Sequence, residues 1–399
     1  MKDYLGVYTV NGKQFTDKIE AILEASQTNA KITWDFHQDR FRKLDWWKEP
    51  ELSLGQLYKI RAQQIRDEYD YVAIMFSGGA DSTNVLHSFL SNNIYVDEII
   101  AGVPLSGLRD FKTVADKRSD NNASEWLLTT MPYLHEVSMS HPNIKISIND
   151  FFETMLEFKT DEWIYQSSDF VHPTTSARYK LDKLTHLKAL ADQGKKIALV
   201  YGIEKPQVNM YEGKFVCSIF DMSVNVPRQP FDIFYPNVDI TLFYSAPDMP
   251  QILAKAAHEV AKVVHLPQYK HVLDHMYDFA WPLEKIARCE STVFQRGIIP
   301  LIYPDINYNS FQAHKSKDLF MADHDAWFYN LHKDTRIYQL TQSDFANFFK
   351  SIKPRYLRKN VPGMPRRAMG FVPFANHYTI GYIKDFAGSA LSNIELSKG

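Results

Sequence analysis

Cysteine is scarce in this chain of 399 residues, which contains only Cys217 and Cys289. So few cysteines exclude a disulfide scaffold and any cysteine-rich zinc or iron–sulfur site. The sequence also lacks a run of about 18 apolar residues, so no transmembrane helix and no membrane partner are expected. Its first residues, MKDYLGVYTV, have no apolar stretch behind basic residues and do not form a secretory signal. We therefore expect a cytoplasmic protein.

The chain also has no large excess of either charge, because it contains 45 basic and 47 acidic residues and its formal net charge is −2. This balance argues against a chain built mainly to coat nucleic acid or an anionic membrane. Hydrophobic residues make up 45% of the chain and charged residues 23%, as in ordinary globular proteins. Aromatic residues are plentiful at 14%, which suits a core of large rings or a pocket for a flat ligand.

The clearest secondary-structure element is YVAIMF at 71–76, a short and continuous apolar run. Such a run predicts a strand buried on both faces, as in a parallel sheet. Similar runs follow at 95–103, 144–148 and 196–201, and the intervals between them leave room for helices. Alternating strands and helices predict an α/β fold with an open, doubly wound parallel sheet. The helices are expected at 54–69, 82–91, 123–134, 151–157 and 176–191.

The spacing of apolar residues divides the chain into three predicted units. Residues 1–50 form a small N-terminal β/α unit, and residues 51–249 form the α/β domain with the parallel sheet. Residues 250–399 form a mainly helical C-terminal region. The other expected elements are strands at 4–10 and 31–36, a helix at 16–25, a hairpin at 206–220 and an irregular basic stretch at 353–377.

The sequence SGGADS at 77–82 directly follows the first buried strand and opens a helix. Glycines permit tight turning and close approach of the backbone, and the free N–H groups of a helix start attract phosphate. The hydroxyls of Ser77, Ser82 and Thr83 add further donors. Asp81 would repel a phosphate, so a divalent cation that bridges its carboxylate to phosphate oxygens explains its presence. The loop therefore predicts a phosphate site with a bound metal ion.

The chain lacks the Walker pattern and the G-x-G-x-x-G pattern. Instead, SGGADS resembles the SGGxDS signature of the N-type PP-loop ATP pyrophosphatases. The resemblance implies an adenine-nucleotide alpha-hydrolase-like sheet, of the HUP or Rossmann-like kind, that binds ATP and Mg²⁺. Such enzymes transfer AMP to a substrate oxygen, release pyrophosphate and let a nucleophile displace AMP. The residues implied to hold pyrophosphate and magnesium are Ser77, Gly78, Gly79, Asp81, Ser82 and Thr83.

Two later strand ends complete the site that the resemblance implies. In the family the end of the second strand meets adenine, so the backbone of Val103 is a candidate contact. The strand at 196–201 runs into Gly202, where NAD and GMP synthetases carry glycine and charged residues. Glu204 is then a candidate second magnesium ligand, and Lys205 a candidate catalytic residue that stabilises the leaving pyrophosphate. The alternative is a solvated Glu–Lys pair in a loop.

The absence of cysteines at particular positions argues against several branches of the family. No cysteine stands at position 2, so a glutaminase unit is not expected and an amine or ammonia donor must arrive separately. No CxxC pair exists, which argues against the thiolating tRNA enzymes. Sulfonucleotide reductases share the loop, but no cysteine follows Cys289 to act as their nucleophile. The chain most resembles stand-alone asparagine synthetase-like and PAPS reductase-like proteins of large tailed phages, which implies the host cytoplasm.

Several basic residues outside the loop are candidate contacts for substrate or phosphate: Arg118, Arg296, Arg358 and Lys359. The last two lie in segment 345–384, which has eight basic residues and no acidic one. Three interpretations of this segment are open: it closes over the phosphates of a bound ligand, it contacts RNA or DNA, or it forms a solvated basic surface. Arg118 is also explained as a surface residue at a helix start. His271 and His275 have no third ligand nearby and are expected in the surface or core.

Together these features predict an ATP-dependent adenylating ligase. It would activate a carbonyl or carboxylate oxygen of a small molecule as an AMP adduct, which an amine or ammonia then attacks. The alternative is a cysteine-independent enzyme that modifies a base of tRNA or DNA, as lysidine synthetase does. The basic segment 345–384 is the feature that discriminates between them.

Overall fold

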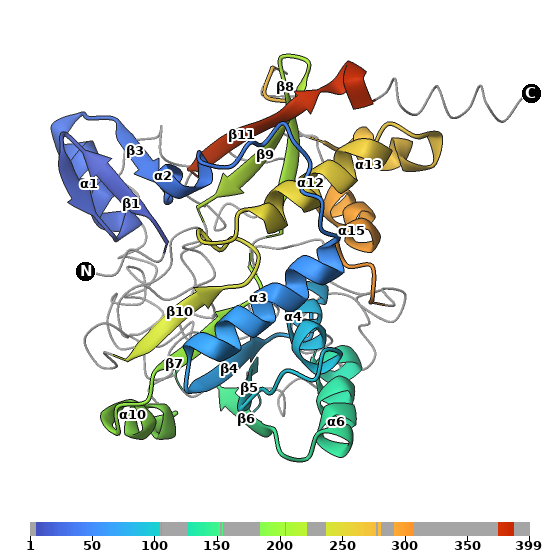
Figure 1. Cartoon of the computed structure of the whole chain (residues 1–399). Coiled ribbons are helices and arrows are strands. Elements are labelled where there is room, and N and C mark those ends of the chain that lie inside the picture. The colour runs from blue at the N-terminus through green and yellow to red at the C-terminus, as the bar shows by residue number, and fades with distance from the viewer. Residues whose placement is uncertain are drawn as a thin grey trace, which may run out of the picture.

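The computed structural model describes residues 5–103, 105, 126–151, 154, 184–203, 205–221, 237–276, 278–280, 291–306 and 374–386. Within these ranges lie one five-stranded parallel sheet and two three-stranded antiparallel sheets. Figure 1 shows the parallel sheet in the lower half of the molecule, with the N-terminal unit at the upper left and strands β8, β9 and β11 at the top.

The central sheet has the order β10-β7-β4-β5-β6, so its first strand along the chain lies in the middle. Ile74 in β4 and Leu199 in β7 are fully buried, because both strands have neighbours on each side. The α/β fold with a parallel sheet is thus confirmed, and the order is compatible with a Rossmann-like architecture. The five strands are β4 (Tyr71–Phe76), β5 (Glu98–Val103), β6 (Lys145–Asp150), β7 (Ile197–Tyr201) and β10 (Val238–Leu242).

Four of the described helices accompany this sheet: α3 (Leu54–Glu68), α4 (Ala80–Leu90), α6 (Met131–Ser140) and α10 (Thr185–Asp192). A capping box of Ser53 and Gln56 starts α3. Helices α3 and α4 lie side by side and pack against β4 (Figure 1). A π-helix, η2 (Trp126–Thr130), leads into α6 where one helix over 123–134 was expected. The helix expected at 151–157 lies largely outside the described residues.

The N-terminal residues form an antiparallel sheet of order β2-β1-β3, which contains the strands expected at 4–10 and 31–36 and is joined by the helix expected at 16–25, whereas β2 and the short α2 were not expected. Asn11 and Gly12 link the first two strands with φ of 49° and 80°. Two positive φ values match the tight hairpin turns that favour Asn-Gly. Asp17 caps the helix by accepting from two of its first N–H groups. The elements are β1 (Val7–Val10), β2 (Lys13–Phe15), α1 (Lys18–Thr28), β3 (Ile32–Asp35) and the short α2 (Gln38–Phe41).

The third sheet corrects one expectation about the C-terminal region. The hairpin expected at 206–220 is present as β8 (Gln207–Tyr211) and β9 (Lys214–Phe220). A third strand, β11 (Ala375–Tyr382), pairs with β9, although its sequence lies in the region expected to be mainly helical and partly in the irregular stretch 353–377. Residues 250–306 do contain helices, which are α12 (Gln251–Val263), η3 (Pro267–Tyr269), α13 (Lys270–Leu273) and α15 (Ser291–Ile302).

One hydrophobic core includes residues of all three predicted units. Between the first and the last unit, the N–H of Phe36 donates to the side-chain oxygen of Asn376 at 3.1 Å. The rings of Trp46 and Tyr378 stack with centroids 4.5 Å apart. The strand β11 thus returns the chain to its N-terminal unit, while the boundaries at residues 50 and 249 stay predictions.

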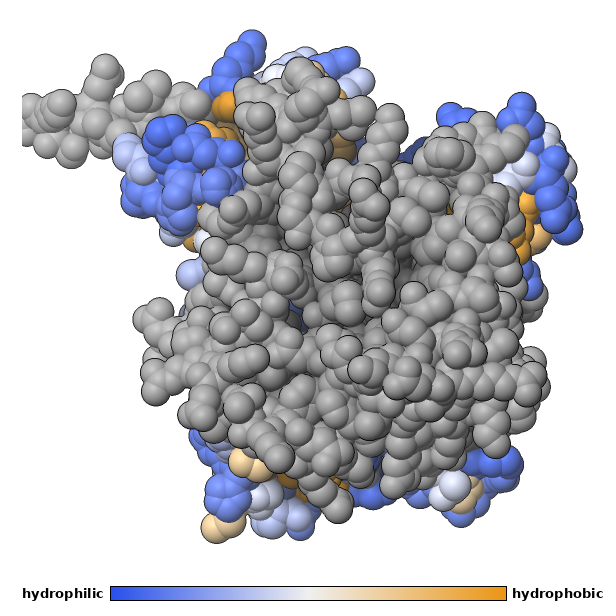
Figure 2. Space-filling model, turned by 180° about the vertical axis from the view of Figure 1, so that it is seen from behind, coloured by the Kyte–Doolittle hydropathy of each residue, from blue (hydrophilic) through white to orange (hydrophobic). Residues whose placement is uncertain are grey.

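The surface seen from behind in Figure 2 is mainly hydrophilic wherever described residues reach it, with small hydrophobic spots between them. Exposed large apolar side chains do occur in the described ranges, such as Met139 on α6 and Trp47 after α2. No helix in these ranges is long and apolar enough to cross a membrane. The cytoplasmic location itself stays a prediction.

A buried ion pair joins the N-terminal unit to the third sheet. The Nζ of Lys18, the first residue of α1, lies 3.1 Å from a carboxylate oxygen of Asp221, just after β9. Their side chains are 1% and 0% exposed. The hydroxyl of Tyr8 in β1 donates to the same oxygen of Asp221. Because a buried charge without its partner is costly, loss of either residue is expected to weaken the contact between the two parts.

We predict that Lys18→Met lowers the free energy of unfolding by about 3–5 kcal/mol, since it leaves the Asp221 carboxylate without its buried counter-ion. Urea denaturation measures the change. The matched control is Lys13→Met, whose partner Glu24 lies 3.0 Å away while Lys13 is 63% exposed. An exposed pair contributes at most about 1 kcal/mol, so equal losses in the two variants would contradict the prediction.

Candidate functional site

The loop 77–82 leaves the carboxyl end of β4 and opens α4, as predicted. The adjacent strand β7 ends beside it and continues into Gly202. A Cβ on Gly202 would lie 3.0 Å from the carbonyl oxygen of Asp81, so the two loops are in direct contact. In the sheet order, chain progression reverses between β4 and β7, and this switch point is where open α/β sheets bind their ligands.

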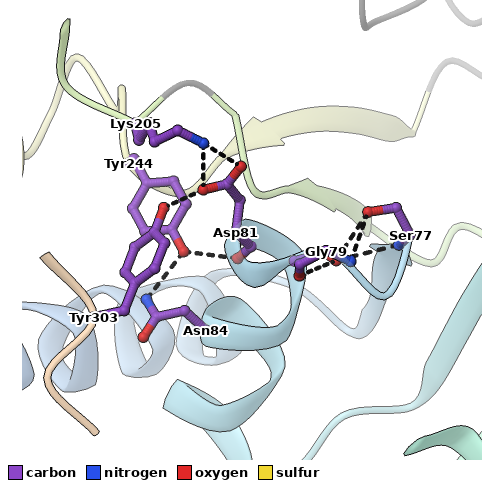
Figure 3. A network of polar contacts seen from close by, with 8 residues as sticks. Ser77, Gly79, Asp81, Asn84, Lys205, Tyr244 and Tyr303 are labelled. Carbon is purple, nitrogen blue, oxygen red and sulfur yellow. Dashed lines mark hydrogen bonds and ion pairs between the residues drawn. The ribbon is translucent and has the colours of Figure 1, made fainter. Parts of the chain in front are cut away.

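Hydrogen bonds within the loop shape it into a tight turn. The N–H of Gly79 donates to Ser77 Oγ at 3.2 Å, and the Ser77 N–H donates to Ser82 Oγ at 3.2 Å. The Ser82 hydroxyl donates to the carbonyl of Gly79 at 3.1 Å. The two serines expected to contact phosphate thus hold the loop itself in shape (Figure 3).

Within the described residues, no side chain caps the start of helix α4. Gly79 occupies the N-cap position and has no side chain to accept a hydrogen bond. The first N–H groups of a helix have no partner inside the helix and carry partial positive charge. This end of α4, at the switch point, is therefore suited to an anion such as a phosphate group.

Gly78 is required at its position for two reasons. Its φ is +80°, a conformation that residues with a Cβ rarely adopt. A Cβ there would also lie 2.1 Å from the hydroxyl oxygen of Thr130, at the end of η2. That hydroxyl donates to the carbonyl of Ser77 at 2.8 Å. The π-helix η2 thus supports the loop from a segment far along the chain.

Asp81 and Lys205, predicted in separate roles, form a direct ion pair (Figure 3). The Nζ of Lys205 lies 2.8 and 3.0 Å from the two carboxylate oxygens of Asp81. The Lys205 side chain is 10% exposed and that of Asp81 is 33% exposed. The alternative of a solvated loop lysine is therefore wrong for Lys205, since its ammonium group is tied to the loop at 77–82.

Two tyrosines also hold Asp81, and sequence reasoning missed both. The Tyr303 hydroxyl donates to the Asp81 carboxylate at 2.5 Å, and the Tyr244 hydroxyl donates to the Asp81 carbonyl at 2.7 Å. Asn84 donates to the Tyr244 oxygen at 3.0 Å. Burial, reinforced by the charge of Asp81, raises the pKa of Tyr244 and Tyr303 well above the ordinary value, so both stay protonated as donors.

A third tyrosine fixes the position of Tyr303. The rings of Tyr58, Tyr244 and Tyr303 pack together. The ring centroid of Tyr303 lies 6.4 Å from that of Tyr58 and 5.5 Å from that of Tyr244. The Tyr58 hydroxyl donates to the carbonyl of Ile302 at 2.6 Å. Tyr58 belongs to α3, Tyr244 follows β10 and Tyr303 follows α15, so no local pattern could have revealed the cluster.

Two further predicted contacts are buried. Thr83 is 2% exposed, and its hydroxyl has no hydrogen-bond partner in the part of the chain that the structure describes. Val103 is 1% exposed at the end of β5, and its carbonyl accepts from the N–H of Phe151 at 3.1 Å. Thr83 is therefore an unpaired donor in the first turn of α4, whereas Val103 already uses its carbonyl in the sheet.

The other predicted residues are not brought to this site by the described structure. Glu204, Arg118, Arg358 and Lys359 lie outside the described residues, as does most of the basic segment 345–384. Arg296 is part of α15, but its side chain is not described. His271 and His275 are placed in and after α13, and among the residues with described positions no three metal-ligating side chains cluster.

Fold and site together define an α/β protein with a glycine-containing loop that opens a helix at the switch point of a parallel sheet. The ion pair of Asp81 and Lys205, which has no net charge, lies next to the start of α4. Such a site can bind a phosphorylated ligand, and it offers one carboxylate to a cation. Comparison of the chain with protein-family models, curated proteins and solved structures found no match.

We predict that Gly78→Ala costs at least about 2 kcal/mol of unfolding free energy, because overpacking against Thr130 adds about 1–3 kcal/mol to the cost of a positive φ. Gly194→Ala is the matched control, since Gly194 has φ of +85° but open space around it. We expect it to cost about 1 kcal/mol, the backbone contribution alone. Chemical denaturation of both variants measures the difference, and equal losses would show that Thr130 does not constrain the loop.

Proposed function

We propose that the protein is an adenylating ligase of the PP-loop ATP pyrophosphatase type, with an adenine-nucleotide alpha-hydrolase-like sheet. It activates a carbonyl or carboxylate oxygen of its substrate by transfer of AMP from ATP, releases pyrophosphate, and passes the adduct to an amine or ammonia. The observation that carries the proposal is the SGGADS loop, which opens an uncapped helix at the switch point of a parallel sheet.

The residues of the site fit a pyrophosphate group. The start of α4 offers N–H groups that no described side chain caps, and Gly78 and Gly79 leave the backbone open to close approach. The buried hydroxyl of Thr83 is an unpaired donor in the same turn, among the described residues. Lys205 supplies a positive charge next to them. A pyrophosphate bound here would receive donors from the backbone and charge from Lys205.

The residues also fit Mg²⁺, which prefers carboxylate and phosphate oxygens. Asp81 is the carboxylate that would hold it, since one third of its side chain is exposed beside the loop. Glu204 stays a predicted second ligand. When bound, the metal would supply charge neutralisation for the phosphate oxygens.

The protein's own groups act on charge and position. The N–H groups of α4 bind and orient the phosphates, which brings the α-phosphate to the acceptor oxygen at little cost in entropy. Lys205 offsets the negative charge that develops on the departing pyrophosphate. Tyr303 keeps the Asp81 carboxylate in place, because its buried hydroxyl donates to that group at 2.5 Å.

A second candidate places the acceptor oxygen on a nucleic-acid base. One observation favours it. Trp47 and Tyr382 are 51% and 40% exposed, and their ring centroids lie 5.4 Å apart. The ammonium groups of Lys214 and Lys384 lie 5.5 and 5.3 Å from the Tyr382 ring. Exposed rings flanked by lysines can stack with bases and pair with phosphates. Lys384 ends the basic segment 345–384, of which only residues 374–384 are described.

The adenylation proposal predicts the fate of ATP. With α-labelled ATP, Mg²⁺ and pooled metabolites or tRNA, we expect AMP and pyrophosphate as products. ADP and phosphate as the only products would refute the mechanism.

Asp81→Ala is expected to reduce AMP release by at least about 10-fold, because removal of groups around a metal site typically costs about 10- to 100-fold in activity. Circular dichroism should show an unchanged fold. Asp192→Ala is the control, because that aspartate forms an exposed pair with Lys188 on α10, away from the loop. Full activity in Asp81→Ala would remove Asp81 from the proposed mechanism.

The nucleic-acid candidate predicts that Tyr382→Ala weakens the binding of a single-stranded oligonucleotide by about 1–3 kcal/mol, the usual contribution of one stacked base. Fluorescence anisotropy at several salt concentrations measures affinity and its salt dependence. Tyr95→Ala is the control, since Tyr95 is 51% exposed before β5 and has no lysine over its ring among the described residues. Equal affinity of both variants would argue for a small-molecule acceptor.

A further inference from the structure

Among the described residues, the carboxylate of Asp81 has two partners of different character. Tyr303 is a neutral donor that is 1% exposed and locked between the rings of Tyr58 and Tyr244. Lys205 is a charged donor on a loop after β7, at the end of a flexible four-carbon stem. The phenol cannot leave Asp81 unless the tyrosine cluster opens, whereas the ammonium group can leave by rotating about side-chain bonds. Tyr303 is thus a permanent partner and Lys205 an exchangeable one.

The position of the Asp81–Lys205 pair determines which ligand each of the two residues would bind. Asp81 lies in the first turn of α4, next to the N–H groups that suit an anion. An ionised Asp81 alone would repel that anion, and Lys205 now cancels its charge at 2.8 Å. An anion at the start of α4 competes with Asp81 for Lys205, because a phosphate carries more charge than a carboxylate. The carboxylate that Lys205 releases is then held by Tyr303 alone and is open to a cation.

We infer that Lys205 is the resident counter-ion of Asp81 and that the two exchange partners when ligands bind. The anion takes Lys205, and the released carboxylate takes a divalent cation. Tyr303 is a positioning residue that keeps Asp81 in place during the exchange. Anion and cation therefore favour each other's binding through one ion pair of the protein. The inference rests on the site of the proposed function, but it concerns binding and requires no turnover.

The exchange makes an unusual prediction for Asp81→Asn. This variant keeps the shape of the side chain and an oxygen that accepts from Tyr303, but it removes the carboxylate charge that pairs with Lys205 at 2.8 Å. We expect pyrophosphate, measured by calorimetry in EDTA without metal, to bind the variant more tightly than wild type by about 5- to 50-fold, a usual size for coupling between ligands. Equal or weaker binding of pyrophosphate would overturn the inference.

The complementary test removes the other partner. Lys205→Met leaves Asp81 without its counter-ion, so we expect Mn²⁺ alone to bind this variant at least about fivefold more tightly than wild type. Electron paramagnetic resonance measures free Mn²⁺ directly. The matched control is Lys196→Met at the opposite end of β7, where Lys196 pairs with Glu68 at 2.7 Å on the surface. Unchanged Mn²⁺ affinity in Lys205→Met, or an equal gain in Lys196→Met, would also overturn the inference.

The two proposals fail separately. If Asp81→Asn gains pyrophosphate affinity but wild type releases no AMP from ATP, adenylation is refuted and the exchange stands. If wild type releases AMP but Asp81→Asn gains nothing, the exchange is refuted and adenylation stands. Should Lys205→Met fail to fold, the Asp81→Asn result decides, because that substitution preserves the packing around Tyr303.

Discussion

The close contact between the loops that follow β4 and β7 is the constraint on which the site depends. A Cβ at Gly202 would lie 3.0 Å from the Asp81 carbonyl and 2.9 Å from the side chain of Val85. Because Gly202 has no side chain, the loop after β7 runs close enough for Lys205 to reach Asp81. Gly78 likewise allows the loop at 77–82 to approach η2 closely, because Thr130 occupies the space that a Cβ would need. Without these approaches the helix start and the ion pair would lie apart.

Packing of aromatic rings extends this constraint to distant parts of the chain. Tyr58, Tyr244 and Tyr303 come from three elements and converge behind Asp81. Their rings exclude water, so each hydroxyl needs a partner inside the protein. Tyr303 and Tyr244 find it in Asp81, and Tyr58 finds it in the backbone before Tyr303. Part of the aromatic excess of the sequence thus serves to position one carboxylate, which ties the geometry of the loop to the end of α15.

Three of the strands that the sequence revealed, β4, β5 and β7, have neighbours on both sides and are largely buried, so each appears as a mainly apolar run. β6 was also expected, but it lies at one edge of the sheet and is partly exposed. β10 lies at the edge of the sheet with a single neighbour, and it tolerates Asp239 and Thr241, so its run is broken and was missed. β11 follows a basic stretch and alternates buried and exposed residues, a pattern that its surroundings concealed. It forms a strand because β9 offers an open edge, which no local signal reports.

The sequence by itself determined the α/β class, the loop at 77–82 and its place between a strand and a helix, because these follow from local apolar runs and from glycines next to one another. It also marked Gly202 and Lys205 as neighbours of a strand end. Only the tertiary structure decided that Lys205 pairs with Asp81, that η2 supports Gly78 and that Tyr244 and Tyr303 hold the carboxylate. These contacts join residues more than 50 positions apart along the chain, such as Ser77 and Thr130. They arise from strand order and ring packing, which depend on the whole fold and leave no periodic trace in the sequence.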